Sequence, residues 1–124
     1  MLYQKLAGIL SICRKAGKLV LGFDPMKEAL EKHHVSGVLT TADISPKTYK
    51  EVCYFCQKQN VPVCPVPLTM LELGSTVGRK AAVAAVTDSG FFDRMQQLCA
   101  ASEQEQHSAP DQKEGFAYGK QEQN

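Results

Sequence analysis

The sequence predicts an α/β protein, a three-layer α-β-α sandwich with a central mixed sheet of about four strands. Amphipathic helical segments alternate with short apolar runs along the first hundred residues, a pattern typical of strands that are covered by helices. The length of 124 residues fits one domain, and 44% hydrophobic residues suffice for an ordinary core. No apolar run is long enough to predict a membrane-spanning segment.

The chain begins with a predicted helix over residues 3–15, which a short apolar strand over 18–21 follows. Four apolar residues recur along this helix at helical spacing, so they predict one buried face. They are Leu6, Ile9, Leu10 and Cys13. We expect Gly17 to end the helix in a left-handed conformation and Gly22 to allow a sharp turn after the strand.

A second helix over residues 25–34 follows that turn directly. Asp24 is a favourable N-cap, and Pro25 is a favourable first residue because its missing N–H would be unpaired there anyway. The positive end of the helix is then expected to point outward beside Lys18. Such a corner suits an anionic ligand, although many proteins with the same local sequence bind nothing there.

The middle of the chain predicts two more strands and a third helix. Residues 38–42 carry no charge and are typical of a strand that is buried on both faces. Ser45 is expected to cap a helix that starts at Pro46 and continues to about residue 59. Residues 61–66 contain two prolines, which cannot donate to a sheet, so this strand is expected at an edge.

A short fourth helix is predicted after that edge strand. Thr69 and Glu72 have the spacing of a capping box, in which each side chain accepts a hydrogen bond from the backbone of the other residue. The helix is expected to end near Gly74 or Gly78.

The domain closes with a strand of small residues over 81–86 and a last helix that Asp88 or Ser89 is expected to cap. Beyond it, Glu, Gln and Ser replace the apolar residues. We therefore predict one α-β-α domain over residues 1–100 and a disordered acidic and polar tail over 101–124.

The net charge of +1 conceals an asymmetry along the chain. Residues 1–100 contain 12 Lys and Arg against 8 Asp and Glu, whereas the tail contains 2 against 5. The first 22 residues contain no acidic residue. A mildly basic body fits a polyanionic partner, although an ordinary solvated surface has the same composition.

No set of side chains predicts catalysis, a metal site or a cofactor. Cys53 and Cys56 have metal-ligand spacing, but they lie on the apolar stripe of the third helix, together with Tyr49 and Val52. A structural zinc also needs four ligands, and no second Cys or His pair has suitable spacing. The odd number of five cysteines predicts reduced thiols inside a cell.

Basic and loop residues are predicted to form one rim at one edge of the sheet. Lys and Arg side chains there can neutralise phosphates and give affinity without sequence preference. The rim comprises Arg14, Lys15, Lys18, Gly22, Phe23, Asp24, Pro25, Asp43, Lys47, Gly78, Arg79 and Lys80.

Five segments, taken in order, give the chain a resemblance to a known family. They read Arg14-Lys-Ala-Gly-Lys-Leu-Val-Leu-Gly22, Leu39-Thr-Thr-Ala-Asp-Ile-Ser-Pro46, Val61-Pro-Val63, Glu72-Leu-Gly-Ser-Thr-Val-Gly78 and Val83-Ala-Ala-Val-Thr-Asp-Ser-Gly-Phe91. Over residues 3–99 the chain resembles the kink-turn RNA-binding ribosomal-protein family (the L-seven-Ae/L-thirty-e group). The first and last segments are most similar to its bacterial YlxQ-like branch.

The resemblance implies an α-β-α sandwich that is not an enzyme and binds RNA through the start of the second helix and the loop before the last strand. In kink-turn binders that helix start typically has four defined positions. In order they carry Gly, then Asn, then either Glu or Gln, and finally Lys. Here Gly22 matches, whereas Asp24, Pro25 and Glu28 replace the other three. The loop used against a base falls on Arg79, Lys80 and Ala81.

The sequence thus predicts a non-catalytic, ribosomal-protein-like protein that contacts structured RNA through the basic rim and the start of the second helix. A cytoplasmic monomer is expected, with ribosome-associated proteins as further candidate partners. The alternative is a protein-interaction module on the same scaffold whose kink-turn site has decayed. An exposed Phe23, with Glu28 behind it, would favour that alternative.

Overall fold

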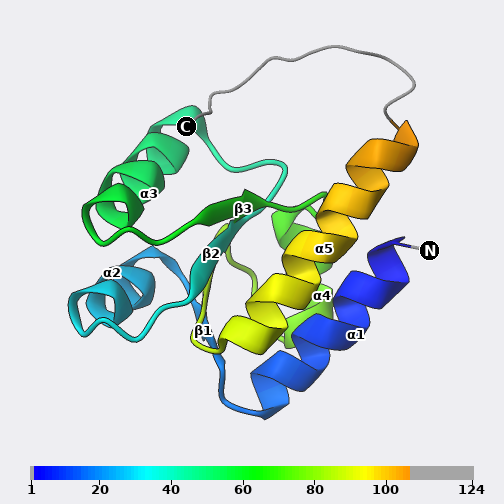
Figure 1. Cartoon of the computed structure of the whole chain (residues 1–124), viewed down its shortest axis with the longest axis horizontal. Helices are drawn as coiled ribbons and strands as arrows, with labels where there is room; N and C mark the ends of the chain where they lie inside the picture. Colours follow the sequence, from blue (N-terminus) through cyan, green and yellow to red (C-terminus); the bar gives the residue numbers. More distant parts are fainter. Residues whose placement is uncertain (1, 107–124) are drawn as a thin grey trace.

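The computed structural model of the chain describes residues 2–106 (Figure 1). Helices and strands alternate along this range, as the sequence predicts. In chain order the elements are α1 (Leu2–Lys15), β1 (Leu19–Leu21), α2 (Phe23–Glu31), β2 (Gly37–Thr40), α3 (Pro46–Lys58), β3 (Val63–Pro65), α4 (Met70–Val77), β4 (Val83–Val86) and α5 (Ser89–Gln106).

The strands of the described range form one mixed sheet in the order β1-β4-β2-β3. β4 lies between β1 and β2 and is antiparallel to both. β3 is parallel to β2 and occupies one edge, as its two prolines predict. β1 occupies the other edge. Because this strand runs between them, the segments before and after β1 lie at opposite ends of the sheet.

Helices cover both faces of this sheet, and the predicted three-layer sandwich is confirmed (Figure 1). α1, α4 and α5 pack on one face around Leu6, Leu10 and Met95, and α2 and α3 pack on the other around Met26 and Val52. Every residue of β2 and β4 is buried. This burial explains why both strands consist of small or apolar residues with an occasional threonine.

The start of α2 differs from the prediction. Gly22, not Asp24, is the N-cap, and its φ of 104° and ψ of 158° define a conformation that essentially only glycine adopts. The N–H of Met26 donates to the carbonyl of Gly22 at 3.0 Å, so Asp24 and Pro25 already lie inside the first turn. Pro25 is tolerated there because first-turn N–H groups have no partner within the helix. The helix also ends earlier than expected, and His33 follows it with a left-handed φ of 61°.

The predicted caps of α3 and α4 are confirmed. The Oγ of Ser45 accepts a hydrogen bond from the N–H of Thr48 at 3.2 Å. Thr69 and Glu72 form the capping box of α4, and Gly78 ends that helix in a left-handed conformation with a φ of 87°. These local signals are strong because each cap satisfies backbone groups that the helix itself leaves unpaired.

The last helix is longer than predicted. Asp88 is the cap, since its Oδ1 accepts from the N–H of Phe91 at 3.0 Å, and α5 continues to Gln106. A disordered tail is predicted from residue 101, but Ala, Glu and Gln are strong helix formers and extend the helix. The rest of that predicted tail, residues 107–124, lies outside the described residues. No helix within the described range is both long and apolar enough to cross a lipid bilayer.

Candidate nucleic-acid interface

Three helices and one loop meet at one end of the sheet, which we call the helix-start end. The N–H of Gly22 donates to the carbonyl of Val83 at 2.8 Å, and the N–H of Thr41 donates to the carbonyl of Ala82 at 3.0 Å. These bonds join the segments that follow β1 and β2 to the loop that precedes β4. The predicted site residues at this end are Gly22, Phe23, Asp24, Pro25, Asp43, Lys47, Gly78, Arg79, Lys80 and Ala81.

The start of α2 is the part of this end best suited to an anion. The side chains of Ser45 and Thr69 cap α3 and α4, whereas no side chain caps α2. The first N–H groups of α2 are therefore available to water or to a ligand, and the helix dipole favours negative charge there. The missing Cβ of Gly22 leaves room for the Pro25 ring, whose Cδ would lie 3.4 Å from a Cβ at that position.

The loop between α4 and β4 brings two cations to the same end. Arg79 and Lys80 are both exposed. The backbone of Lys80 lies against α4, since a Cβ placed on Gly74 would be 3.1 Å from the Lys80 Cα. This close packing holds the loop in place next to the start of β4, which is hydrogen-bonded to Gly22. Arg79 and Lys80 therefore lie at the same end of the sheet as the uncapped helix start.

Asp43 serves the fold as well as this surface. Its Oδ1 accepts a hydrogen bond from the N–H of Met70, the first residue of α4, at 3.0 Å. The Oε1 of Glu72 accepts from the N–H of Thr69 at 2.9 Å. Both carboxylates thus compensate the positive end of the α4 dipole. Lys47, exposed on the first turn of α3, adds a cation to this end.

The prediction of one continuous basic rim is wrong, because Arg14, Lys15 and Lys18 lie at the opposite end of the sheet. Lys18 precedes β1 and Gly22 follows it, so a rise of about 3.3 Å per residue separates their Cα atoms by about 13 Å. The carbonyl of Lys18 accepts from the N–H of Thr87, beyond the far end of β4, at 2.9 Å. Figure 1 shows the end of α1 and the start of α5 at this second end, which we call the α1 end.

The α1 end has a hollow of its own and a structural explanation for its cations. The hollow measures about 590 Å³. Its lining comprises Gly17, Lys18, His33, His34, Val35, Ser36 and Thr87. Arg14 and Lys15 occupy the last turn of α1, where a cation compensates the negative end of the helix dipole. No ligand is needed to account for them.

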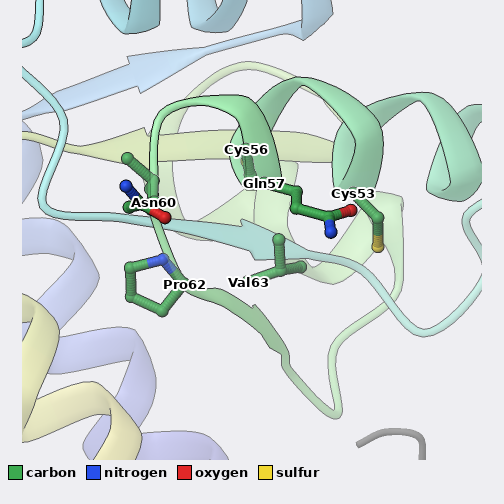
Figure 2. Close-up of a pocket in the computed structure, with 7 residues that line it drawn as sticks. Cys53, Cys56, Gln57, Asn60, Pro62 and Val63 are labelled. Atoms are coloured by element: carbon green, nitrogen blue, oxygen red, sulfur yellow. The ribbon is translucent and has the colours of Figure 1, made fainter. Parts of the chain in front are cut away.

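The two cysteines of α3 differ in burial. Cys56 is buried as predicted, whereas Cys53 is half-buried beside a shallow groove between α3 and β3 (Figure 2). The groove has a volume of about 470 Å³. Burial raises the pKa of the Cys56 thiol to about 12, with a smaller contribution from Cys53. Within the described range, no group of three His, Cys, Asp or Glu side chains is placed to hold a metal ion.

Phe23 is packed against α3 rather than exposed. It is half-buried, and its ring centre lies 6.0 Å from that of Phe55. Lys27 lies beside both rings, and Tyr54 contacts the ring of Phe55. Sequence spacing does not predict this cluster, because it joins two helices that β2 separates along the chain. The one feature of the sequence that could have indicated this cluster is the position of Tyr54, an aromatic residue outside the apolar stripe of α3.

Comparisons with known proteins agree with this fold. The model of the ribosomal protein L7Ae/L30e/S12e/Gadd45 family matches residues 4–95. RNA-binding protein YlxQ from Bacillus subtilis is 33% identical over 88 residues, which cover 70% of this chain and 87% of the relative. Large ribosomal subunit protein eL30 from Neurospora crassa is 27% identical over 92 residues, covering 73% and 84%.

Two solved structures have the same architecture. A Bacillus halodurans protein of unknown function superposes with a TM-score of 0.71 at 25% identity, covering 77% of this chain and 97% of that one. A 15.5 kD RNA-binding protein from Giardia lamblia superposes with a TM-score of 0.64, covering 83% and 88%. The second pair is 14% identical, so it bears on the fold alone.

Proposed function

Because the chain belongs to the ribosomal protein L7Ae/L30e/S12e/Gadd45 family, we propose that it is a non-catalytic RNA-binding protein of the ribosomal type and that the helix-start end is its RNA surface. Its Bacillus subtilis relative is named an RNA-binding protein, and its Neurospora crassa relative is a ribosomal subunit protein. The observation that carries the assignment of the surface is the uncapped start of α2 beside the Arg79–Lys80 loop.

Phosphate recognition follows from the arrangement of that end. The N–H groups of Phe23 and Asp24 supply donors, since the N–H of Gly22 is bonded to Val83 and Pro25 has none. Arg79 and Lys80, exposed in the loop that leads to Val83 and its hydrogen bond with Gly22, add positive charge at this end of the sheet. Such contacts hold an RNA backbone in register without reading its bases.

Base recognition at the start of α2 is weaker than in kink-turn binders. Asp24 accepts hydrogen bonds but cannot donate them, and Pro25 has no polar side chain. Glu28 turns an attraction for phosphate into a repulsion, although Lys32 compensates part of its charge across 3.7 Å. We therefore propose that the protein binds structured RNA with little preference for kink-turns.

The cations of the α1 end contribute to RNA binding only through long-range attraction. The Cα of Lys18 lies about 13 Å from that of Gly22, which exceeds the Debye length of about 8 Å at physiological ionic strength, and Arg14 and Lys15, on α1, precede Lys18. Their effect on affinity should therefore disappear as salt is added. Arg79 and Lys80, which we assign to direct phosphate contacts, should still contribute at physiological salt, although less than at low salt.

A pair of charge-matched double variants tests the assignment. Arg79→Ala with Lys80→Ala should weaken binding to a kink-turn hairpin and to a plain RNA hairpin alike, by roughly tenfold, because phosphate contacts carry no sequence information. The slope of log affinity against log salt should become shallower by up to about two. Arg14→Ala with Lys15→Ala removes the same charge from the opposite end and serves as the control.

Fluorescence anisotropy over a salt series gives both quantities. Equal losses for the two double variants at physiological salt would show that net charge alone matters. A larger loss for the Arg14–Lys15 variant would place the RNA at the α1 end and refute the proposed surface.

Protein docking at the same end is the second candidate function. Leu71, on the first turn of α4, is 72% exposed and favours it, whereas the packed Phe23 does not. Pull-down from a nuclease-treated lysate discriminates between the two functions, because a partner that persists without RNA and is lost with Leu71→Ser supports docking.

On either account we propose that the protein acts as a cytoplasmic monomer, and ribosome-associated proteins are the partners to expect.

A further inference from the structure

Three aromatic rings form a row that leads from the start of α2 across α3. The ring centres of Phe23 and Phe55 are 6.0 Å apart with an interplanar angle of 67°. Those of Phe55 and Tyr54 are 5.1 Å apart at 78°. Both pairs have the edge-to-face geometry that aromatic side chains prefer. We call Phe23, Phe55 and Tyr54 the aromatic row.

Two lysines accompany the row. The Nζ of Lys27 lies 4.7 Å from the ring centre of Phe55 and 5.8 Å from that of Phe23. The Nζ of Lys58 lies 5.2 Å from the ring centre of Tyr54. Cation–π attraction thus keeps two ammonium groups beside the rings. The surface combines aromatic rings with positive charge along its whole length.

Packing between helices explains part of this row but not Tyr54. Phe23 and Phe55 are half-buried and join α2 to α3. Tyr54 is 57% exposed, so its ring contributes little apolar burial to the core. A large aromatic side chain held against a ring on one side and exposed to solvent elsewhere is suited to contact with a ligand.

An exposed ring that is flanked by half-buried rings and by lysines is suited to single-stranded nucleic acid. Unpaired bases stack on aromatic faces, while ammonium groups neutralise the phosphates between them. A duplex cannot use such a surface, because its bases already stack on each other. Negative charges also lie nearby: Asp24, Glu28 and Glu31 are on α2, where Glu28 is paired with Lys32. Glu51 is on α3. The lysines that lie directly against the rings are Lys27 and Lys58.

We propose that the aromatic row binds a single-stranded extension of the structured RNA, with a base stacked on Tyr54 and phosphates beside Lys27 and Lys58. The inference rests on the proposed function, because the row begins at Phe23, directly after the N-cap glycine of α2. RNA that leaves the helix-start end along α2 therefore meets the row first. The occupant is the RNA strand and not an apolar peptide, since the ammonium groups flank the rings.

Two matched RNAs test the proposal: a hairpin with a blunt end, and the same hairpin with a single-stranded oligouridylate tail at either terminus. Tyr54→Ala should weaken binding of a tailed hairpin by roughly tenfold and leave the blunt hairpin unchanged, because one stacking contact is lost. Tyr54→Phe keeps the ring and should bind like the parent protein. Tyr3→Ala removes an exposed tyrosine from α1, on the other face of the sheet, and is the control.

The outcomes separate this inference from the proposed function. If the parent protein binds both hairpins equally and Tyr54→Ala changes neither affinity, the aromatic row is not an RNA site, although RNA binding itself stands. If the parent protein binds no RNA, the proposed function fails first. Equal losses for Tyr54→Ala on the blunt and tailed hairpins, with a folded circular dichroism spectrum, would also overturn the proposal, because the effect would not depend on the single strand.

Discussion

Asp24 places a carboxylate inside the uncapped first turn of α2. There it complements the helix dipole but occupies the position from which a ligand would be bound. A phosphate that approaches the first N–H groups meets this negative charge, and a base edge meets a group that can only accept. On the proposed RNA surface, the residue would therefore favour the stability of the helix at the expense of affinity for RNA.

Replacing Asp24 by Asn should raise affinity for a kink-turn hairpin by roughly tenfold, since it removes a repulsive charge and restores a donor worth about 1–3 kcal/mol. The variant Asp93→Asn removes the same charge from the exposed side of α5 and is the control. Anisotropy titrations of both variants provide the comparison. A loss of affinity with Asp24→Asn would mean that the carboxylate itself accepts a hydrogen bond from the RNA.

The buried thiols carry a pH dependence of stability. Burial, with the charge of Asp88 as a smaller cause, raises the pKa of Cys13 from 9.0 to about 11. Burial likewise raises the pKa of Cys56 to about 12. Above pH 9 the unfolded chain releases these protons and the folded chain retains them. The stability is therefore fully present below pH 9 and is lost as pH rises toward the folded values.

We expect the free energy of unfolding to fall above pH 9 by up to about 1.4 kcal/mol per pH unit for each thiol. Urea denaturation at a series of alkaline pH values measures this slope. The variant Cys56→Ala should lose its share of the slope, whatever its stability at neutral pH. An unchanged slope would mean that Cys56 is not protonated in the folded protein at these pH values.

At the scale of the elements, local rules predict the helices and strands well but misplace the start of α2. Asp24 and Pro25 are the best local candidates for a cap and a first residue. The structure starts the helix earlier because the N–H of Gly22 is already committed to the carbonyl of Val83. That bond belongs to the pairing of β1 with β4, which residues far apart in the sequence decide. A rule that considers only neighbouring residues therefore does not predict this bond.

The contact between α5 and β2 gives a prediction at this scale. The ring of Phe92 fills the space that a Cβ on Gly37 would occupy. Gly37→Ala should therefore lower the free energy of unfolding by about 1–3 kcal/mol through overpacking. Gly8→Ala is the control, since no atom lies within 4 Å of its Cβ position and alanine favours the helix. Thermal denaturation should shift in opposite directions for the two variants, and a similar shift for both would contradict this packing.

At the scale of the whole molecule, two separate ends replace the single rim that the sequence suggests. Lys18 and Gly22 are close in sequence, but a strand that runs between them carries them to opposite ends of the sheet. Arg79 and Gly22 are far apart in sequence, yet the pairing of β1 with β4 brings their segments together. The motif at the helix start and the loop before β4 could be predicted. Their separation from the α1 end depends on strand order and direction, which composition and spacing do not specify.

The most direct test of the RNA surface is a titration of the isotope-labelled protein with a kink-turn hairpin, followed by amide NMR shifts. We predict that the largest changes fall on residues 22–27, 41–47 and 78–82, at the helix-start end. The amides of residues 14–18, 33–36 and 87, at the α1 end, should change little at physiological salt. Changes concentrated at the α1 end, with the start of α2 unaffected, would contradict the account.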